Sequence, residues 1–324
     1  MARRIEITRT GGPEVMEWVE CDLPEPGEED VRIRSTAIGL NFIDIYHRRG
    51  SYTIPLPSGL GGESVGVVEA VGPGVTELRE GDRVGTFGPE LGAYATERNL
   101  PAERLVKLPD DVDDQTAAAL LLKGATAEFL VERCASVREG QTVLVHAAAG
   151  GVGHLLVGWL KAIGATVIGT VGSADKAARA EKAGADHVIL HKQEDVVERV
   201  RAITGGAGVP VVFDGVGKAT WQQSLDCAAR RGLIVSFGSA SGPVEGVSLG
   251  TLSAKGSLFV TRPTLFDYAV TRDERQATLD RVFAMLANGA IRPGIGQTFA
   301  LEDVAEAHRR LEAGETEGAT VLIP

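Results

Sequence analysis

The residues best suited to chemistry form a glycine-rich turn at 147–153, which reads AAAGGVG. A short apolar run, Val143 to Val145, precedes it, and apolar residues follow at helical spacing up to Gly164. Small residues let the backbone approach a pyrophosphate, and the first N–H groups of a helix point at such an anion. The AxxGxxG spacing departs from the GxGxxG dinucleotide fingerprint, and a turn built only for packing is the alternative. A second strand, Thr166 to Val171, completes a βαβ unit, so we expect Ala149-Gly150-Gly151-Val152 to contact a dinucleotide.

The end of the second strand predicts which nicotinamide cofactor binds. A site for NAD usually places an acid near this point, where it holds the ribose 2′-hydroxyl. The sequence instead reads Gly172-Ser173-Ala174-Asp175-Lys176, which offers N–H and hydroxyl donors and a lysine directly after the only acid. Donors and a cation attract a 2′-phosphate. We expect NADPH rather than NADH, with a solvated surface lysine as the alternative reading of Lys176.

The bulk composition excludes several classes of protein. With 324 residues the chain is too long for one ordinary core, which favours two domains. The net charge of -11 argues against broad binding to nucleic acid or anionic lipid. Three scattered cysteines suit a reducing compartment, and no apolar run is long enough to span a bilayer. We expect a cytoplasmic protein without a membrane segment.

The elements that must position the glycine turn fall into three stretches. Residues 1–122 show short strands between Gly and Pro turns, which is typical of an antiparallel, barrel-like domain. Residues 123–262 alternate strands with helices, which predicts a doubly wound parallel sheet. Residues 263–324 are too few for an independent core, so we expect them to fold back on the first stretch. The predicted domains are therefore 1–122 plus 263–324, and an inserted domain of 123–262.

Several motifs, in order along the whole chain, resemble one family. They are Asn41–Asp44 (NFID), Gly61–Gly66 (GGESVG), Gly81–Val84 (GDRV), His146–Gly153 (HAAAGGVG) and Ser257–Pro263 (SLFVTRP). Together they resemble the zinc-independent NADPH:quinone oxidoreductases, related to zeta-crystallin, of the medium-chain dehydrogenase/reductase superfamily. The resemblance implies an α/β fold in which a Rossmann domain is inserted into a GroES-like, mainly β catalytic domain. It also implies a metal-free enzyme that reduces quinones with NADPH.

The same resemblance assigns residues to the site. Asn41, Asp44, Tyr46 and Tyr52 would line its catalytic side, where the two phenols face an aromatic ring and donate through their hydroxyls. Asp44 would orient its neighbours rather than act as a general base. Ordinary packing of the tyrosines, a turn-forming role of Asn41 and a surface role of Arg262 are the alternatives. Beyond the glycine turn, the expected cofactor contacts are Asn41, Thr126, Gly172, Ser173, Lys176, His191, Val216, Phe237, Gly238, Ser239, Ser241, Val260 and Arg262.

The positions of metal ligands in zinc-dependent relatives hold other residue types here. Asn41 stands where those relatives have a Cys, and Gly62 where they have a His. The six histidines do not cluster in sequence, so we expect no metal.

Two positions also depart from bacterial quinone reductases. His191 replaces a Tyr and Gly314 an Arg near the adenosine 2′-phosphate, which weakens the expected preference for NADPH.

A quinone suits such a site, because its conjugated ring spreads incoming negative charge and hydrogen-bond donors suffice to stabilise it. An enone or alkenal reductase, which uses the same hydride geometry, remains an alternative. So does a non-catalytic, crystallin-like NADPH-binding protein with affinity for RNA, which the acidic net charge disfavours. The resemblance also implies a homodimer, paired through an edge strand late in the nucleotide domain.

Overall fold

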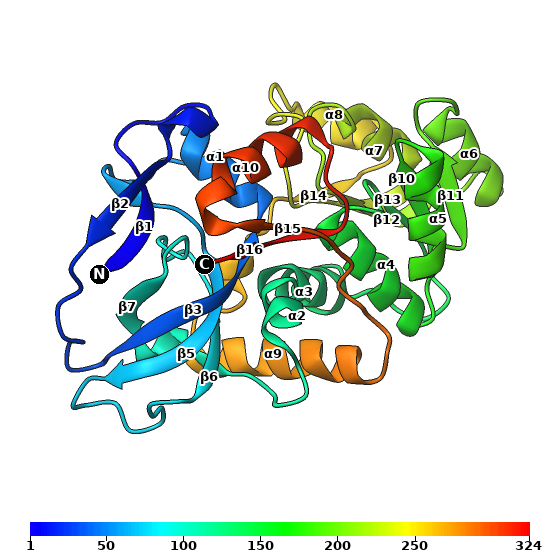
Figure 1. The fold of residues 1–324 in the computed structure, drawn as a ribbon. Coiled ribbons are helices and arrows are strands. Elements are labelled where there is room, and N and C mark those ends of the chain that lie inside the picture. Colours follow the sequence, from blue (N-terminus) through cyan, green and yellow to red (C-terminus); the bar gives the residue numbers. More distant parts are fainter. The chain divides into compact units, whose positions relative to one another are not determined.

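The computed structural model describes residues 1–324, which divide into two compact units (Figure 1). The first unit comprises Met1–Leu122, Val270–Ala277 and Pro293–Pro324. The second comprises Lys123–Ala269 and Thr278–Arg292. No helix of the chain combines the length and the apolar character that crossing a membrane requires.

The first unit is built on a seven-stranded sheet in the order β15-β16-β3-β5-β6-β8, with β7 also paired to β3. A smaller sheet has the order β2-β1-β4. Most pairs are antiparallel, as predicted from the short strands and turns. The strands are β1 Ala2–Ile7, β2 Glu17–Cys21, β3 Asp30–Leu40, β4 Ser58–Gly59, β5 Glu63–Val71, β6 Arg83–Phe87, β7 Glu97–Pro101, β8 Val106–Lys107, β15 Ile295–Ala300 and β16 Ala319–Ile323.

The carboxyl end of β3 is the point from which the candidate site of this unit is built. β3 leads directly into the helix α1, Phe42–Arg49, and the C-terminal strand β16 pairs with the last residues of β3. Leu40 of β3 and Leu322 of β16 share a buried core with Val304, which begins the C-terminal helix. The other helices of this unit are η1 Pro13–Val15, η2 Ala102–Arg104, α2 Asp114–Ala118, η5 Leu301–Asp303 and α10 Val304–Ala313.

The second unit contains a six-stranded, wholly parallel sheet in the order β11-β10-β9-β12-β13-β14. Its central strands β9, β10 and β12 are rich in Val and Ile and buried on both faces, as parallel strands covered by helices require. The chain runs outward from β9 in one direction and from β12 in the other, which makes the β9–β12 boundary the topological switch point. The strands are β9 Thr142–Val145, β10 Thr166–Val171, β11 His187–Leu190, β12 Val209–Asp214, β13 Ala228–Ser236 and β14 Phe259–Thr261.

Helices connect successive strands of this sheet. Because crossovers between parallel strands are right-handed almost without exception, the strand order implies that the helices of the β9-β10-β11 half cover one face and those of the β12-β13 half the other. The predicted fold class is therefore confirmed, and ligands of such sheets bind at the carboxyl ends of the strands. The helices that lie wholly or mostly in this unit are α3 Leu121–Glu128, the π-helix η3 Phe129–Cys134, α4 Gly151–Ala162, α5 Ala174–Ala183, α6 Val196–Ile203, α7 Trp221–Cys227, α8 Leu249–Ala254, η4 Leu265–Asp267 and α9 Arg272–Ala287. The first residues of α3 and of α9, up to Leu122 and Ala277, belong to the first unit.

The segment after residue 262 divides differently from the expected domains, which assigned all of 263–324 to the first one. Residues 263–269 and 278–292 group with the second unit. Specific contacts explain this grouping. Tyr268 stacks on Phe129 with ring centroids 4.7 Å apart, Arg133 Nη2 donates to Thr278 Oγ1 over 3.0 Å, and Arg281 pairs with Glu132 at 2.8 Å.

Candidate functional site

The glycine-rich turn joins β9 to α4, as predicted. Ala147 adopts a left-handed backbone conformation with φ of 53°, and α4 begins at Gly151. A Cβ on Gly153 would lie 2.2 Å from the carbonyl oxygen of Ala147, so close packing requires a glycine at position 153. The N-cap residue Gly150 makes no side-chain cap. The first N–H groups of α4 therefore keep their capacity to bind an anion, and packing accounts for only part of the motif.

The carboxyl end of β10 gathers cationic side chains. Ser173 caps α5, where its Oγ lies 3.5 Å from the backbone nitrogen of Lys176. A Cβ on Gly172 would lie 3.3 Å from His191 Nε2 and 3.6 Å from Lys192 Cε, so the segment after β11 adjoins the segment after β10. Burial, followed by the charges of Lys192 and Lys176, lowers the pKa of His191. Both ammonium groups therefore act on the His191 imidazole.

The side chains at this strand end suit a ribose that carries a 2′-phosphate. Two lysines, a hydroxyl and an imidazole are donors that suit a 2′-phosphate, and they come together although His191 stands about 15 residues beyond Lys176. Sequence reasoning missed Lys192. Its only signal was its place directly after His191, because nothing local indicates that the two strand ends adjoin.

Two neighbouring loops follow β12 and β13. Asp214, 1 % exposed, holds the first loop, since its carboxylate accepts from the backbone nitrogens of Val216 and Gly217 at 2.9 and 3.0 Å. Ser241 joins the second loop to the first, because its Oγ donates to the Val216 carbonyl over 2.8 Å. The structure thus brings together the predicted residues Val216, Phe237, Gly238, Ser239 and Ser241. Sequence reasoning missed Asp214, the buried carboxylate whose hydrogen bonds hold the first of these loops.

Arg262 follows the edge strand β14 and stabilises the second loop. Its Nη1 donates to the carbonyl oxygens of Ser236 and Gly238 at 2.8 and 2.9 Å. Val260 lies within β14, opposite Ile234 of β13. Thr126, the remaining predicted contact of this unit, is half-buried on α3. The cofactor roles of these residues remain predictions.

In the first unit, Asn41 and Asp44 form the start of α1. Asn41 is the N-cap residue, and its backbone N–H donates to Asp44 Oδ2 over 2.9 Å. The Asn41 side chain donates through Nδ2 to Glu63 Oε2 over 2.8 Å. Glu63 is fully buried and also accepts from the backbone nitrogen of Leu122 at 2.6 Å. Asn41 is thus a cap held by a buried carboxylate, which sequence reasoning did not identify.

Three aromatic rings follow one another along α1 and just beyond its end. Tyr46 lies 5.6 Å from Phe42 and 5.2 Å from Tyr52, measured between ring centroids, and the second pair meets edge to face. Tyr52 is 39 % exposed, so its ring is available to a ligand. Asp44 is fully buried and accepts from the hydroxyl of Tyr94 at 2.8 Å, which fits an orienting carboxylate better than a base in contact with a substrate.

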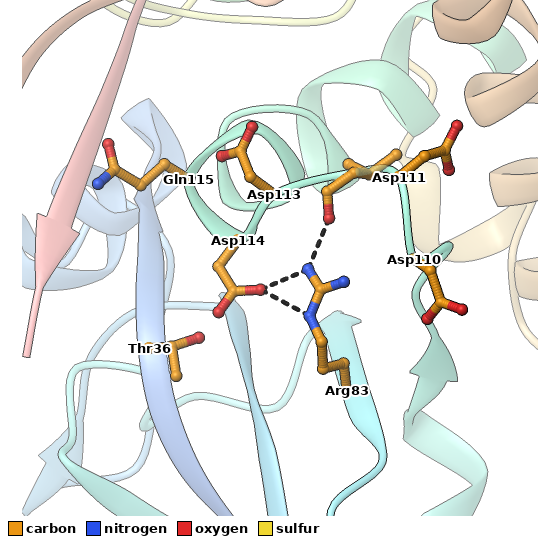
Figure 2. Close-up of a pocket in the computed structure, with 8 residues that line it drawn as sticks. Thr36, Arg83, Asp110, Asp111, Asp113, Asp114 and Gln115 are labelled. Atoms are coloured by element: carbon orange, nitrogen blue, oxygen red, sulfur yellow. Dashed lines mark hydrogen bonds and ion pairs between the residues drawn. The ribbon is translucent and has the colours of Figure 1, made fainter.

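A cavity of about 580 Å³ in the first unit lies near the loop 110–115 (Figure 2). Its central cation, Arg83, donates to Asp114 Oδ1 over 2.6 Å and to the carbonyl oxygen of Val112 over 2.5 Å. Asp113 caps α2. These groups therefore join the loop to β6, and the cavity offers no further catalytic set. Across the chain, no three His, Cys, Asp or Glu side chains form a group that could hold a metal ion.

Comparisons with known proteins agree with this arrangement. Residues 27–110 match the alcohol dehydrogenase GroES-like domain, and residues 151–287 match the zinc-binding dehydrogenase family. A quinone oxidoreductase of Pseudomonas aeruginosa is 52 % identical, with 100 % of each chain covered. The structure of Escherichia coli quinone oxidoreductase complexed with NADPH superposes with a TM-score of 0.97 at 47 % identity, covering 99 % of this chain and 100 % of that one. A 2-haloacrylate reductase of a Burkholderia species is 44 % identical over 98 % of both chains. The chain belongs to the quinone oxidoreductase family of the medium-chain dehydrogenases/reductases.

Proposed function

We propose that this protein is an NADPH-dependent quinone reductase. The observation that carries the proposal is the cationic cluster at the end of β10, which suits the 2′-phosphate that distinguishes NADPH from NADH. The quinone oxidoreductases at 47–52 % identity over the full length support the reaction. When bound, NADPH supplies the hydride equivalent, which is the chemistry that the side chains themselves lack.

The second unit would hold the cofactor with groups that follow five strands, β9 to β13. The N–H groups at the start of α4 would bind the pyrophosphate. Ser173, Lys176, His191 and Lys192 would bind the 2′-phosphate, and the loops after β12 and β13 would support the nicotinamide end. The loops owe their shape to Asp214 and Arg262, whose hydrogen bonds hold backbone atoms in place.

The first unit would supply the acceptor's surroundings. Tyr46 on α1 and Tyr52 just beyond the end of α1 would present ring edges and hydroxyls, which suit a flat apolar ring with two carbonyl groups. Because a quinone delocalises negative charge, neutral donors are enough and no strong acid is required. The side chains act by orienting the acceptor and by donating hydrogen bonds.

A panel of acceptors tests the proposal. Oxidation of NADPH would be followed by absorbance with ortho- and para-quinones, enones, alkenals and 2-haloacrylates, and the panel would be repeated with NADH. We expect the highest kcat/KM with quinones and NADPH. The relative named 2-haloacrylate reductase makes reduction of an activated carbon–carbon double bond the second candidate. High turnover of alkenals or haloacrylates together with poor turnover of quinones would replace the first candidate by the second.

We further propose that the enzyme is a homodimer that works in the cytoplasm. One side of β14 pairs with β13 and the other is the open edge of the sheet. Phe259 on β14 is 61 % exposed, and Leu249 on α8 is 81 % exposed. A twofold partner would cover such an edge, and the three free thiols suit a reducing compartment. Light scattering at micromolar protein should give twice the mass of one chain, and monomer mass alone would contradict the dimer.

A further inference from the structure

A line of four buried side chains connects α10 to the start of α1 within the first unit. Arg48 Nη1 lies 2.9 Å from His308 Nδ1, and His308 Nε2 lies 3.0 Å from the hydroxyl of Tyr94. The hydroxyl of Tyr94 lies 2.8 Å from Asp44 Oδ2. All four side chains are fully buried, although they come from α1, the loop before β7 and the C-terminal helix.

Elementary donor chemistry fixes the direction of every hydrogen bond in this line. Arg48 has only donors, so it donates to His308 Nδ1. The neutral imidazole then carries its proton on Nε2 and donates to Tyr94, whose hydroxyl donates to the Asp44 carboxylate. Burial, followed by the charge of Arg48, lowers the pKa of His308 to about 3. Burial, followed by the charge of Asp44, raises the pKa of Tyr94.

This line of hydrogen bonds fixes the positions of its side chains but does not transfer protons at neutral pH. A relay would need His308 to accept a proton, which the adjacent guanidinium opposes. The Arg48 end of the line is also held by charged partners, because Arg48 Nη2 donates to Glu312 over 2.5 Å and Glu312 also pairs with Arg49 at 2.7 Å. The line therefore delivers one fully committed hydrogen bond to Asp44.

Asp44 passes this constraint to the candidate site. The Oδ2 atom that accepts from Tyr94 also accepts from the backbone nitrogen of Asn41 at 2.9 Å. That bond closes the first turn of α1, which fixes the side chain of Asn41 and the direction of the helix that bears Tyr46. Loss of the Tyr94 hydroxyl would leave Asp44 with fewer donors and the helix start free to adjust.

We propose that Tyr94 and His308 are positioning residues for acceptor reduction, which act through Asp44 on the start of α1. This inference rests on the proposed function. It predicts a much larger effect on the acceptor than on the cofactor, because, apart from Asn41, the cofactor contacts described above lie in the second unit. A role in stability alone would lower the melting temperature without changing acceptor kinetics of the folded enzyme.

The test combines two variants with a matched control. Tyr94→Phe should lower kcat/KM for the best acceptor of the panel about tenfold, while the Kd for NADPH changes less than twofold. Tyr268→Phe removes a phenol that lies in the second unit beside Cys134 and should leave both quantities unchanged. His308→Gln retains an acceptor for Arg48 and a donor for Tyr94, so it should keep most of the acceptor kcat/KM, whereas His308→Leu should lose it as Tyr94→Phe does.

The outcomes separate the inference from the proposed function. Wild-type enzyme that reduces another acceptor but no quinone would refute the function, and the same variants would then test the inference on that acceptor. Folded Tyr94→Phe enzyme with wild-type acceptor kcat/KM would refute the inference. Equal losses of acceptor kcat/KM in His308→Gln and His308→Leu would refute it as well, because the direction of the hydrogen bonds would then be irrelevant.

Discussion

Replacement of the lysines at the end of β10 by alanine, one at a time, tests the origin of the preference for NADPH. Lys176 lies in the first turn of α5, and Lys192 lies beside Gly172. A Cβ on Gly172 would lie 3.6 Å from Lys192 Cε, and the charges of Lys192 and Lys176 both lower the pKa of His191, so we expect both lysines to contact a phosphate bound at this strand end. NADH lacks this phosphate, and its affinity should therefore be almost unchanged by either substitution.

The expected size of the effect follows from the type of contact that each lysine would make. A charge-assisted hydrogen bond contributes about 1.5–3 kcal/mol, which corresponds to a loss of about ten- to a hundredfold in affinity. Lys192 is the more exposed of the two lysines, so water competes with its contact and its loss should lie near the lower limit.

Titration calorimetry with NADPH and NADH at one fixed ionic strength provides the assay. Lys182→Ala is the matched control, because Lys182 lies on the same helix but in its last turn. We expect the ratio of the two dissociation constants to shift for Lys176→Ala and Lys192→Ala and to remain constant for Lys182→Ala. Equal losses for both cofactors, or no loss at either position, would refute the assignment of this cluster to the phosphate.

Three further substitutions have definite expected outcomes. Gly153→Ala places a Cβ 2.2 Å from the Ala147 carbonyl oxygen and should lower both the melting temperature and the affinity for NADPH. Gly150→Ala places its Cβ 3.2 Å from the same oxygen and should lower both quantities less. Equal melting temperatures of the two variants would contradict this expectation. Tyr52→Phe should lower kcat by about tenfold or less, since one neutral hydrogen bond contributes about 0.5–1.5 kcal/mol, and a much larger loss would indicate proton transfer by the phenol. In the unfolded chain His308 is protonated below about pH 6.5, whereas in the folded chain it is protonated only near its pKa of about 3. The free energy of unfolding therefore keeps its full value above pH 6.5 and falls by about 2 kcal/mol when the pH is lowered to 5. Denaturant unfolding of His308→Gln should lack this dependence on pH.

The local elements of the fold were predictable because their signals lie close together in the sequence. The stretch 142–171 contains an apolar strand, small turn residues and a helical apolar period, and it forms β9, α4 and β10. The division of residues 114–134 into α2, α3 and the π-helix η3 has no such local signal. Phe129, the first residue of η3, packs on Tyr268, a contact between residues far apart in the chain.

The site was predictable only where resemblance or local chemistry marked it. Asp214 organises two loops through buried hydrogen bonds, and Lys192 adjoins Gly172 across two strand ends, so neither has a local sequence signal. The partners of Tyr94 lie 50 and 214 residues away along the chain. Such contacts depend on the order of strands and on helix packing, which a single sequence does not specify.

Asn41 illustrates how the position of a metal ligand in zinc-dependent relatives can serve a different purpose. Its amide donates to the buried Glu63, and its backbone N–H donates to Asp44, so its environment supplies two carboxylates that are both occupied by donors. Asn41→Leu would leave Glu63 without one donor, which costs about 1–3 kcal/mol or more for a buried charge. Loss of activity in that variant would therefore mix destabilisation with loss of an acceptor contact. Glu63→Gln is the control for destabilisation, because it removes the buried charge and keeps one oxygen that can accept from Asn41, while the bond from the Leu122 N–H is lost. If activity survives in Glu63→Gln and fails in Asn41→Leu, the Asn41 amide itself acts on the acceptor, and its anchoring carboxylate serves only to hold it.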